Sequence, residues 1–248
     1  MVYRIGDFYI DYPESNFPLV NDRFMDAFRV SEEVLKDETV DKKDIIRFRT
    51  EYKDLKEISD CKQLHYSSLS ELYETEEGTM LIYHWCKSRF GIGYWMKDLD
   101  KEEIVCYINP QMHEQLPVDG NWFFSICGLH RALLKREAPV LHASYIDWNG
   151  KAILFSAPSQ TGKSTQARLW ETHEQTPIIN DDRVLLRKKN DMWQAYGYPS
   201  CGSSKICINR TLPIAALVIL VQGQENVVRP MTLGEKITAL FSGIEIYT

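Results

Sequence analysis

The chain has 248 residues, of which 44% are hydrophobic and 26% charged, as in an ordinary globular protein with a sizeable core. Its net charge of −6 argues against a general nucleic-acid-binding protein, whose surface would be basic. No apolar run is long enough for a membrane span and the N-terminus lacks a signal-peptide core, so we expect a cytoplasmic protein with neither membrane nor nucleic acid as partner.

Residues 1–120 are predicted to form a β-rich N-terminal region. Apolar residues alternate with polar ones around Tyr3 and Phe8, which is typical of half-buried strands. Prolines and asparagines predict a loop over residues 13–24, and the charged run 31–43 predicts a solvated face or loop. Further strands, rich in β-branched and aromatic residues, are expected at residues 45–50, 79–85, 91–96 and 104–108.

Residues 121–248 are predicted to form the second region. An amphipathic helix is expected over residues 121–137, ended by Pro139. A β-hairpin should follow, because two apolar runs flank an Asn149-Gly150 turn signal. Later strands are expected at residues 178–180, 184–187, 193–198 and 215–221, the last of them buried because it is continuously apolar, and a helix should close the chain.

The second strand of this hairpin leads into residues 157–165, whose pattern is typical of a phosphate-binding P-loop. In such a loop, backbone N–H groups and the following helix N-terminus surround phosphate oxygens. Lys163 would reach the β- and γ-phosphates, and the Ser164 hydroxyl would bind Mg²⁺. The predicted nucleotide-binding residues are Pro158, Ser159, Gln160, Thr161, Gly162, Lys163, Ser164 and Thr165. Ala157 stands where the usual pattern has its first glycine.

Each of these signals has a plainer interpretation. The loop could be an ordinary turn before an amphipathic helix, with Lys163 solvated. Asp181 and Asp182, which end the 178–180 strand, occupy the place where P-loop enzymes hold carboxylates, but could equally form a turn with Asp182 paired to Arg183. His142, on the strand beside the one that enters the loop, could be a buried structural histidine. Cys201 and Cys207 could be a redox pair or metal ligands, although reduced thiols are the simpler interpretation.

Taken together, these motifs resemble the catalytic domain of HPr kinase/phosphorylase, whose ATP-binding core is shared with phosphoenolpyruvate carboxykinase. The resemblance covers roughly residues 138–222 and is carried by the run from Ser159 to Lys163 and by residues 178–183. It implies an α/β protein in which the β-rich N-terminal part precedes a P-loop core of this type. By this resemblance, Asp181 would be the general base, Asp182 would assist the metal with Ser164, and His142 would line the active site beside Lys163.

The chain departs from the family pattern at two further places. The metal-binding glutamate of the family has no counterpart in residues 202–207. The family's C-terminal arginine has only Arg210 and Arg229 as late candidates. The chain is also much shorter than a complete phosphoenolpyruvate carboxykinase, which argues against decarboxylation.

The sequence therefore predicts a kinase that uses ATP and Mg²⁺ to phosphorylate a hydroxyl-bearing acceptor, either a serine in a protein or peptide or a small molecule. A homo-oligomer is compatible with this prediction. A second hypothesis is a nucleotide-binding regulatory module of the same fold without turnover, which the missing glutamate would fit. A third is a structural protein whose loop binds no nucleotide.

Overall fold

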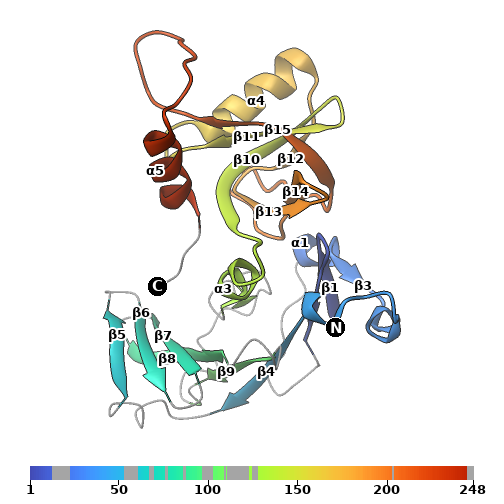
Figure 1. The fold of residues 1–248 in the computed structure, drawn as a ribbon, viewed down its shortest axis with the longest axis vertical. Helices are drawn as coiled ribbons and strands as arrows, with labels where there is room; N and C mark the ends of the chain where they lie inside the picture. The colour runs from blue at the N-terminus through green and yellow to red at the C-terminus, as the bar shows by residue number, and fades with distance from the viewer. Residues whose placement is uncertain are drawn as a thin grey trace. The chain divides into compact units, whose positions relative to one another are not determined.

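The computed structural model describes residues 1–12, 23–52, 61–66, 70–75, 78–85, 88–96, 103–108, 110, 123–124, 128–202 and 204–244. The fold is mixed α/β and consists mostly of strands (Figure 1). It divides into two compact units, whose boundary follows Ala132. The division near residue 120 that we expected from the sequence stays a prediction, because residues 111–122 lie outside the described part.

The first unit contains a nine-stranded sheet with the order β3-β1-β2-β4-β9-β8-β7-β6-β5. Its strands are β1 (Val2–Ile5), β2 (Phe8–Asp11), β3 (Arg29–Val30), β4 (Ile45–Tyr52), β5 (Lys62–Tyr66), β6 (Ser70–Thr75), β7 (Gly78–Trp85), β8 (Ser88–Met96) and β9 (Glu103–Ile108). The six strand predictions in this region are confirmed, whereas β3, β5 and β6 were not predicted. Among the described strands of this sheet, β4 alone makes parallel pairs, with β2 and β9.

Short helical segments precede β4. They are α1 (Arg23–Asp26) and two 3₁₀ turns, η1 (Glu32–Lys36) and η2 (Lys42–Asp44). Neither 3₁₀ turn buries a residue, which confirms the prediction of a solvated segment over residues 31–43. The predicted loop over residues 13–24 lies mostly outside the described residues.

Aromatic side chains form the core of the first unit. The ring of Phe124 packs edge to face against three others. These are Tyr3 of β1, Tyr12 directly after β2 and Phe48 of β4, with ring centroids 5.8, 5.9 and 4.9 Å from that of Phe124. All four rings are buried. Such edge-to-face pairs place the positive ring edge against the negative face, which stabilises them beyond the burial of their area.

The predicted helix over residues 121–137 is only partly confirmed. Residues 123–124 and α3 (Leu129–Leu134) are helical, and residues 125–127 lie outside the described part. The helix ends before Pro139, because the chain turns over residues 135–137 and Glu137 adopts a positive φ of 58°.

The second unit contains a six-stranded sheet with the order β11-β15-β14-β13-β10-β12. Its elements are β10 (Val140–Trp148), β11 (Lys151–Ser156), α4 (Lys163–Glu174), β12 (Ile178–Asn180), β13 (Arg183–Lys189), β14 (Met192–Gly197), β15 (Thr211–Ile219) and α5 (Leu233–Gly243). An additional β10–β11 pairing closes five of these strands into a ring. Asn149 and Gly150 have φ values of 50° and 78°, which confirms the predicted hairpin turn.

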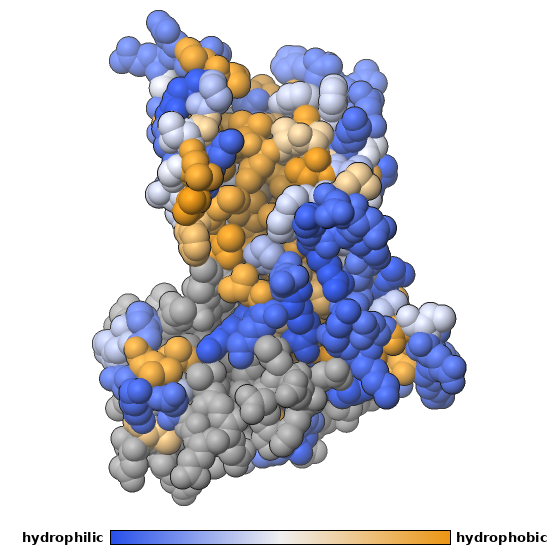
Figure 2. Space-filling view, viewed as in Figure 1, coloured by the Kyte–Doolittle hydropathy of each residue, from blue (hydrophilic) through white to orange (hydrophobic). Residues whose placement is uncertain are grey.

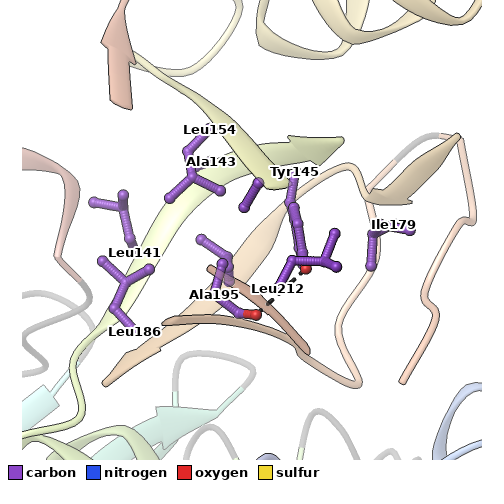
Figure 3. Packing of buried hydrophobic residues seen from close by; sticks show 10 residues of the cluster. Leu141, Ala143, Tyr145, Leu154, Ile179, Leu186, Ala195 and Leu212 are labelled. Atoms are coloured by element: carbon purple, nitrogen blue, oxygen red, sulfur yellow. Dashed lines mark hydrogen bonds between the residues drawn. The ribbon is translucent and has the colours of Figure 1, made fainter. Parts of the chain in front are cut away.

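A cluster of buried aliphatic residues and one tyrosine fills the ring (Figure 3). It draws Leu141, Ala143 and Tyr145 from alternate positions of β10, since successive side chains of a strand point to opposite faces. The Tyr145 hydroxyl donates to the carbonyl of Ala195 at 3.3 Å, so its buried polar atom is satisfied. Burial raises the pKa of Tyr145 far above its usual range, so the phenol stays neutral.

The strand predicted at residues 215–221 forms β15, but the prediction that it is buried is wrong. Of this strand only Leu212 is buried, and its other apolar residues remain partly or fully exposed. Helix α5 presents Leu233, Ile237 and Phe241 to solvent at a spacing that places them on one stripe. Figure 2 shows apolar side chains gathered on this surface of the second unit, around α5 and the neighbouring strands.

Candidate functional site

Strand β10 brings the predicted site residues together. One side of β10 pairs with β11, so that Ala143 lies opposite Ser156, the last residue before the 157–165 loop. Its other side pairs first with β13, placing His142 opposite Arg183, and then with β12, placing Tyr145 opposite Asn180. The Asp181-Asp182 turn between β12 and β13 therefore lies across β10 from the start of the loop.

The 157–165 loop has the strand–loop–helix order that the sequence predicted. Gln160 and Gly162 both adopt positive φ values, 63° and 112°, and Gly162 forms the N-cap of α4 without a side-chain hydrogen bond. A residue with a side chain at position 162 would be strained at this φ. Because Gly162 has no side chain that could cap the helix, it gives the first N–H groups of α4 no side-chain acceptor. These groups form the positive end of the helix dipole.

Lys163 is the first residue of α4, and its side chain folds back onto the loop. The lysine is only 7% exposed, and its Nζ donates to the carbonyls of Ala157 and Pro158 at 3.0 and 3.1 Å. Burial lowers the pKa of Lys163, and the nearby Asp182 carboxylate opposes this shift. The structure thus excludes the plainer interpretation of Lys163 as a solvated residue.

Asn180 holds the acidic turn in place. Its side chain is fully buried, and its Oδ1 accepts from the backbone N–H groups of Asp182 and Arg183, both at 2.9 Å. Its Nδ2 donates to the carbonyls of Tyr198 and Ser200 at 2.7 and 2.9 Å. One side chain therefore fixes both the turn and the chain after β14. No role was predicted for Asn180, although an asparagine just before a turn commonly forms an Asx turn.

Replacing Asn180 by alanine should destabilise the protein strongly. Four backbone groups would lose a buried partner at once, and we expect the free energy of unfolding to fall by about 3 kcal/mol or more. Urea unfolding measures this change, with Asn226→Ala, an exposed position, as the control that should stay within about 0.5 kcal/mol. A loss below about 1 kcal/mol for Asn180→Ala would contradict this role.

Asp182 points toward the loop side of the turn and joins a charged cluster. Its Oδ1 lies 3.4 Å from Nε2 of His142, and its Oδ2 accepts from the Arg183 guanidinium at 2.6 Å. Burial would by itself raise the pKa of Asp182, but the His142 hydrogen bond and the charges of Arg183, His142 and Lys163 outweigh it, so the pKa is lowered. Asp182 therefore remains ionised beside Lys163 at neutral pH. The predicted Asp182–Arg183 pairing is present as well.

Asp181 points the other way. Its carboxylate is 2% exposed and accepts two backbone N–H groups, from Gly202 and from Ser204, each at 2.7 Å. Its main-chain oxygen accepts from the hydroxyls of Ser144 and Ser164 at 3.2 and 3.4 Å. The roles predicted for the two adjacent aspartates stay predictions, but their surroundings differ sharply.

Both late arginines have carboxylate partners. Arg210 is paired with the buried carboxylate of Asp147, beside the hairpin turn at the end of β10 far from the 157–165 loop. Arg229 pairs with Glu235 at 2.7 Å, where Glu235 and Thr232 form the capping box of α5.

The Cys207 thiol donates to the Tyr198 carbonyl at 2.9 Å. Within the described residues, no three His, Cys, Asp or Glu side chains converge as a metal site.

A family model described as "SynChlorMet cassette protein ScmC" matches residues 104–243, from β9 to the end of α5. No curated protein matches the chain. Solved structures do match, among them the HPr(Ser) kinase/phosphatase from Coxiella burnetii, at 14% identity and a TM-score of 0.30, over 38% of this chain and 66% of that one. This chain thus spans slightly less than two thirds of that protein. Among the helices of the described residues, none has the length and apolar character needed to cross a membrane.

Proposed function

The chain belongs to the SynChlorMet cassette protein ScmC family, and from this premise and the geometry of the 157–165 loop we propose that it is an ATP-dependent kinase acting on a hydroxyl-bearing acceptor. The observation that carries the proposal is the buried Lys163 ammonium, held at the start of α4 beside the ionised Asp182. A buried cation at a helix N-terminus suits a phosphate, because both favour negative charge.

The loop also fits the phosphate chain of a nucleotide. Gln160 and Gly162 adopt positive φ values, which occur in loops that bind anions. The Thr161 N–H donates to the Pro158 carbonyl at 3.4 Å, so the phosphates would contact the other N–H groups of the loop. Ser164 and Asp182 would hold Mg²⁺, which supplies charge neutralisation at the phosphates. Two protein ligands suffice for this ion, since Mg²⁺ keeps several waters and binds substrate phosphates. These are the metal residues predicted from the sequence.

The proposed reaction transfers the γ-phosphoryl group. The acceptor oxygen forms a bond to the γ-phosphorus while the bond to the β,γ-bridging oxygen breaks, and ADP leaves. The acceptor's proton passes to a carboxylate. For this step we propose Asp182, as the alternative to its metal role, rather than Asp181, because Asp182 is partly exposed and faces Lys163, whereas the Asp181 carboxylate is enclosed by backbone N–H groups. His142 orients the Asp182 carboxylate through Nε2.

One observation favours the second hypothesis, a nucleotide-binding regulatory module. Arg210 and Arg229 are the late arginines that could neutralise charge on a transferred phosphoryl group, and each is paired with another carboxylate. Such a module would bind nucleotide without turnover. Measuring ADP formation together with nucleotide binding therefore separates the two functions, because the kinase forms ADP and the module binds nucleotide without forming it.

Nucleotide binding is the first test. We expect saturating MgATP to raise the melting temperature of the wild-type protein by about 5 °C, because a ligand at about 100 times its Kd adds about 2.7 kcal/mol of stability. Scanning fluorimetry with MgATP, ATP without Mg²⁺, and Mg²⁺ alone measures the shift. A melting temperature that stays unchanged at millimolar MgATP would refute both nucleotide-binding functions.

A further inference from the structure

Asp181 connects three parts of the second unit. Its carboxylate holds the N–H groups of Gly202 and Ser204, and its main-chain oxygen receives the Ser164 hydroxyl from the first turn of α4. Asp181 thus links residues 200–202 and 204–205, called the 200–205 loop below, to Ser164 of the predicted nucleotide site. A second contact joins the same parts, since Arg168 of α4 donates to the Ser204 hydroxyl at 3.0 Å.

The fit between Asp181 and the 200–205 loop is close. A Cβ added at Gly202 would lie 3.2 Å from Oδ2 of Asp181, tighter than most real contacts. Glycine lets the loop backbone approach the carboxylate closely enough for a 2.7 Å hydrogen bond. Two short hydrogen bonds to one carboxylate, from N–H groups two residues apart, hold this part of the loop in place.

The same contacts argue against a reacting role for this carboxylate. A general base must come within about 2.6–3.2 Å of the proton that it takes. Asp181 is 2% exposed, and each of its oxygens already accepts a short hydrogen bond. The carboxylate of its neighbour Asp182 is instead partly exposed and lies next to His142.

We propose that Asp181 is a positioning residue, which anchors the 200–205 loop against α4 so that the loop forms one wall of the site for nucleotide and acceptor. The anchoring itself is independent of catalysis. The statement that the loop borders the nucleotide rests on the proposed kinase function.

Asp181→Asn tests the anchor. The asparagine amide keeps one oxygen that can accept, but its NH₂ group would face the second backbone N–H of the 200–205 loop. That N–H loses its acceptor, and the loop then opens more easily. Cys201 lies in this loop and is half-buried, and its reaction with N-ethylmaleimide reports the opening. We expect labelling of the Cys201 peptide, followed by mass spectrometry, to accelerate about tenfold. Asp191→Asn makes the same change in the exposed turn between β13 and β14, is the matched control and should change the rate less than twofold.

Addition of MgATP gives the second arm. We expect it to slow Cys201 labelling at least threefold in the wild type and to have no such effect in Asp181→Asn, an effect that a merely structural anchor would not show. If MgATP binds by thermal shift but leaves the wild-type labelling rate unchanged, the loop does not border the nucleotide and the proposal is wrong. If MgATP does not bind at all, the kinase function fails, while a tenfold acceleration in Asp181→Asn still establishes the anchor.

Two results would overturn the anchor itself. One is an unchanged Cys201 labelling rate in a folded Asp181→Asn protein that has lost turnover, which would return the base role to Asp181. The other needs no variant: the amides of Gly202 and Ser204 should exchange with solvent deuterium at least about tenfold more slowly than unbonded loop amides. Rapid exchange of both in the wild type would exclude the two hydrogen bonds even if Asp181→Asn does not fold.

Discussion

Lys163→Ala should abolish detectable MgATP binding while the protein remains folded. The side chain places a buried ammonium at the start of α4. Removing a desolvated charge that pairs with an anion typically costs about 2–5 kcal/mol, so we expect the affinity to fall by about 100-fold or more. Isothermal titration calorimetry and the MgATP-induced shift in melting temperature measure the loss.

The matched control is Lys151→Ala. This substitution removes the same charge at the opposite end of β11, where the side chain is exposed. The MgATP affinity of the Lys151→Ala protein should equal that of the wild type. Lys163→Met keeps most of the buried stem and separates lost packing from lost charge, so it should bind MgATP as weakly as the alanine variant. Retention of wild-type affinity in Lys163→Met would show that the lysine does not contact phosphate.

Asp182→Asn should reduce phosphoryl transfer, or slow ATP hydrolysis without acceptor, by roughly 10²–10⁴-fold, the usual contribution of a positioned base. The asparagine keeps the size of the side chain but can neither take a proton nor balance Lys163 and Arg183. MgATP affinity should change by only a few-fold if the carboxylate acts on the acceptor. ADP formation at saturating Mg²⁺, measured beside nucleotide affinity, checks both statements.

The Mg²⁺ dependence separates the two roles considered for Asp182. If the carboxylate acts mainly as a metal ligand, excess Mg²⁺ will restore turnover in Asp182→Asn; if it takes the proton, turnover will stay low. Asp191→Asn makes the same change in the exposed β13–β14 turn and should leave turnover unaffected. Full activity of Asp182→Asn at ordinary Mg²⁺ would remove Asp182 from the mechanism.

The sequence by itself determined the order of elements in the second unit. The Asn149-Gly150 turn, the apolar runs beside it and the helix after Gly162 are specified by neighbours in the chain, because turn type and periodicity are short-range properties. For the same reason the acidic pair could be placed at the end of a short strand. The glycine at the α4 N-cap was recognisable too, although its φ of 112° was not.

Only the tertiary structure decided the burial of β15 and what each aspartate faces. The burial of an apolar strand depends on which elements cover its two faces, and those elements come from elsewhere in the chain. Asp181 and Asp182 lie in the turn between β12 and β13, so the direction of each side chain is set by the turn that Asn180 holds and by the groups that surround it. Which of them meets His142 follows from the pairing of β12 and β13 with one side of β10, while the other meets the 200–205 loop. Such pairings join residues distant in sequence, and no local pattern encodes them.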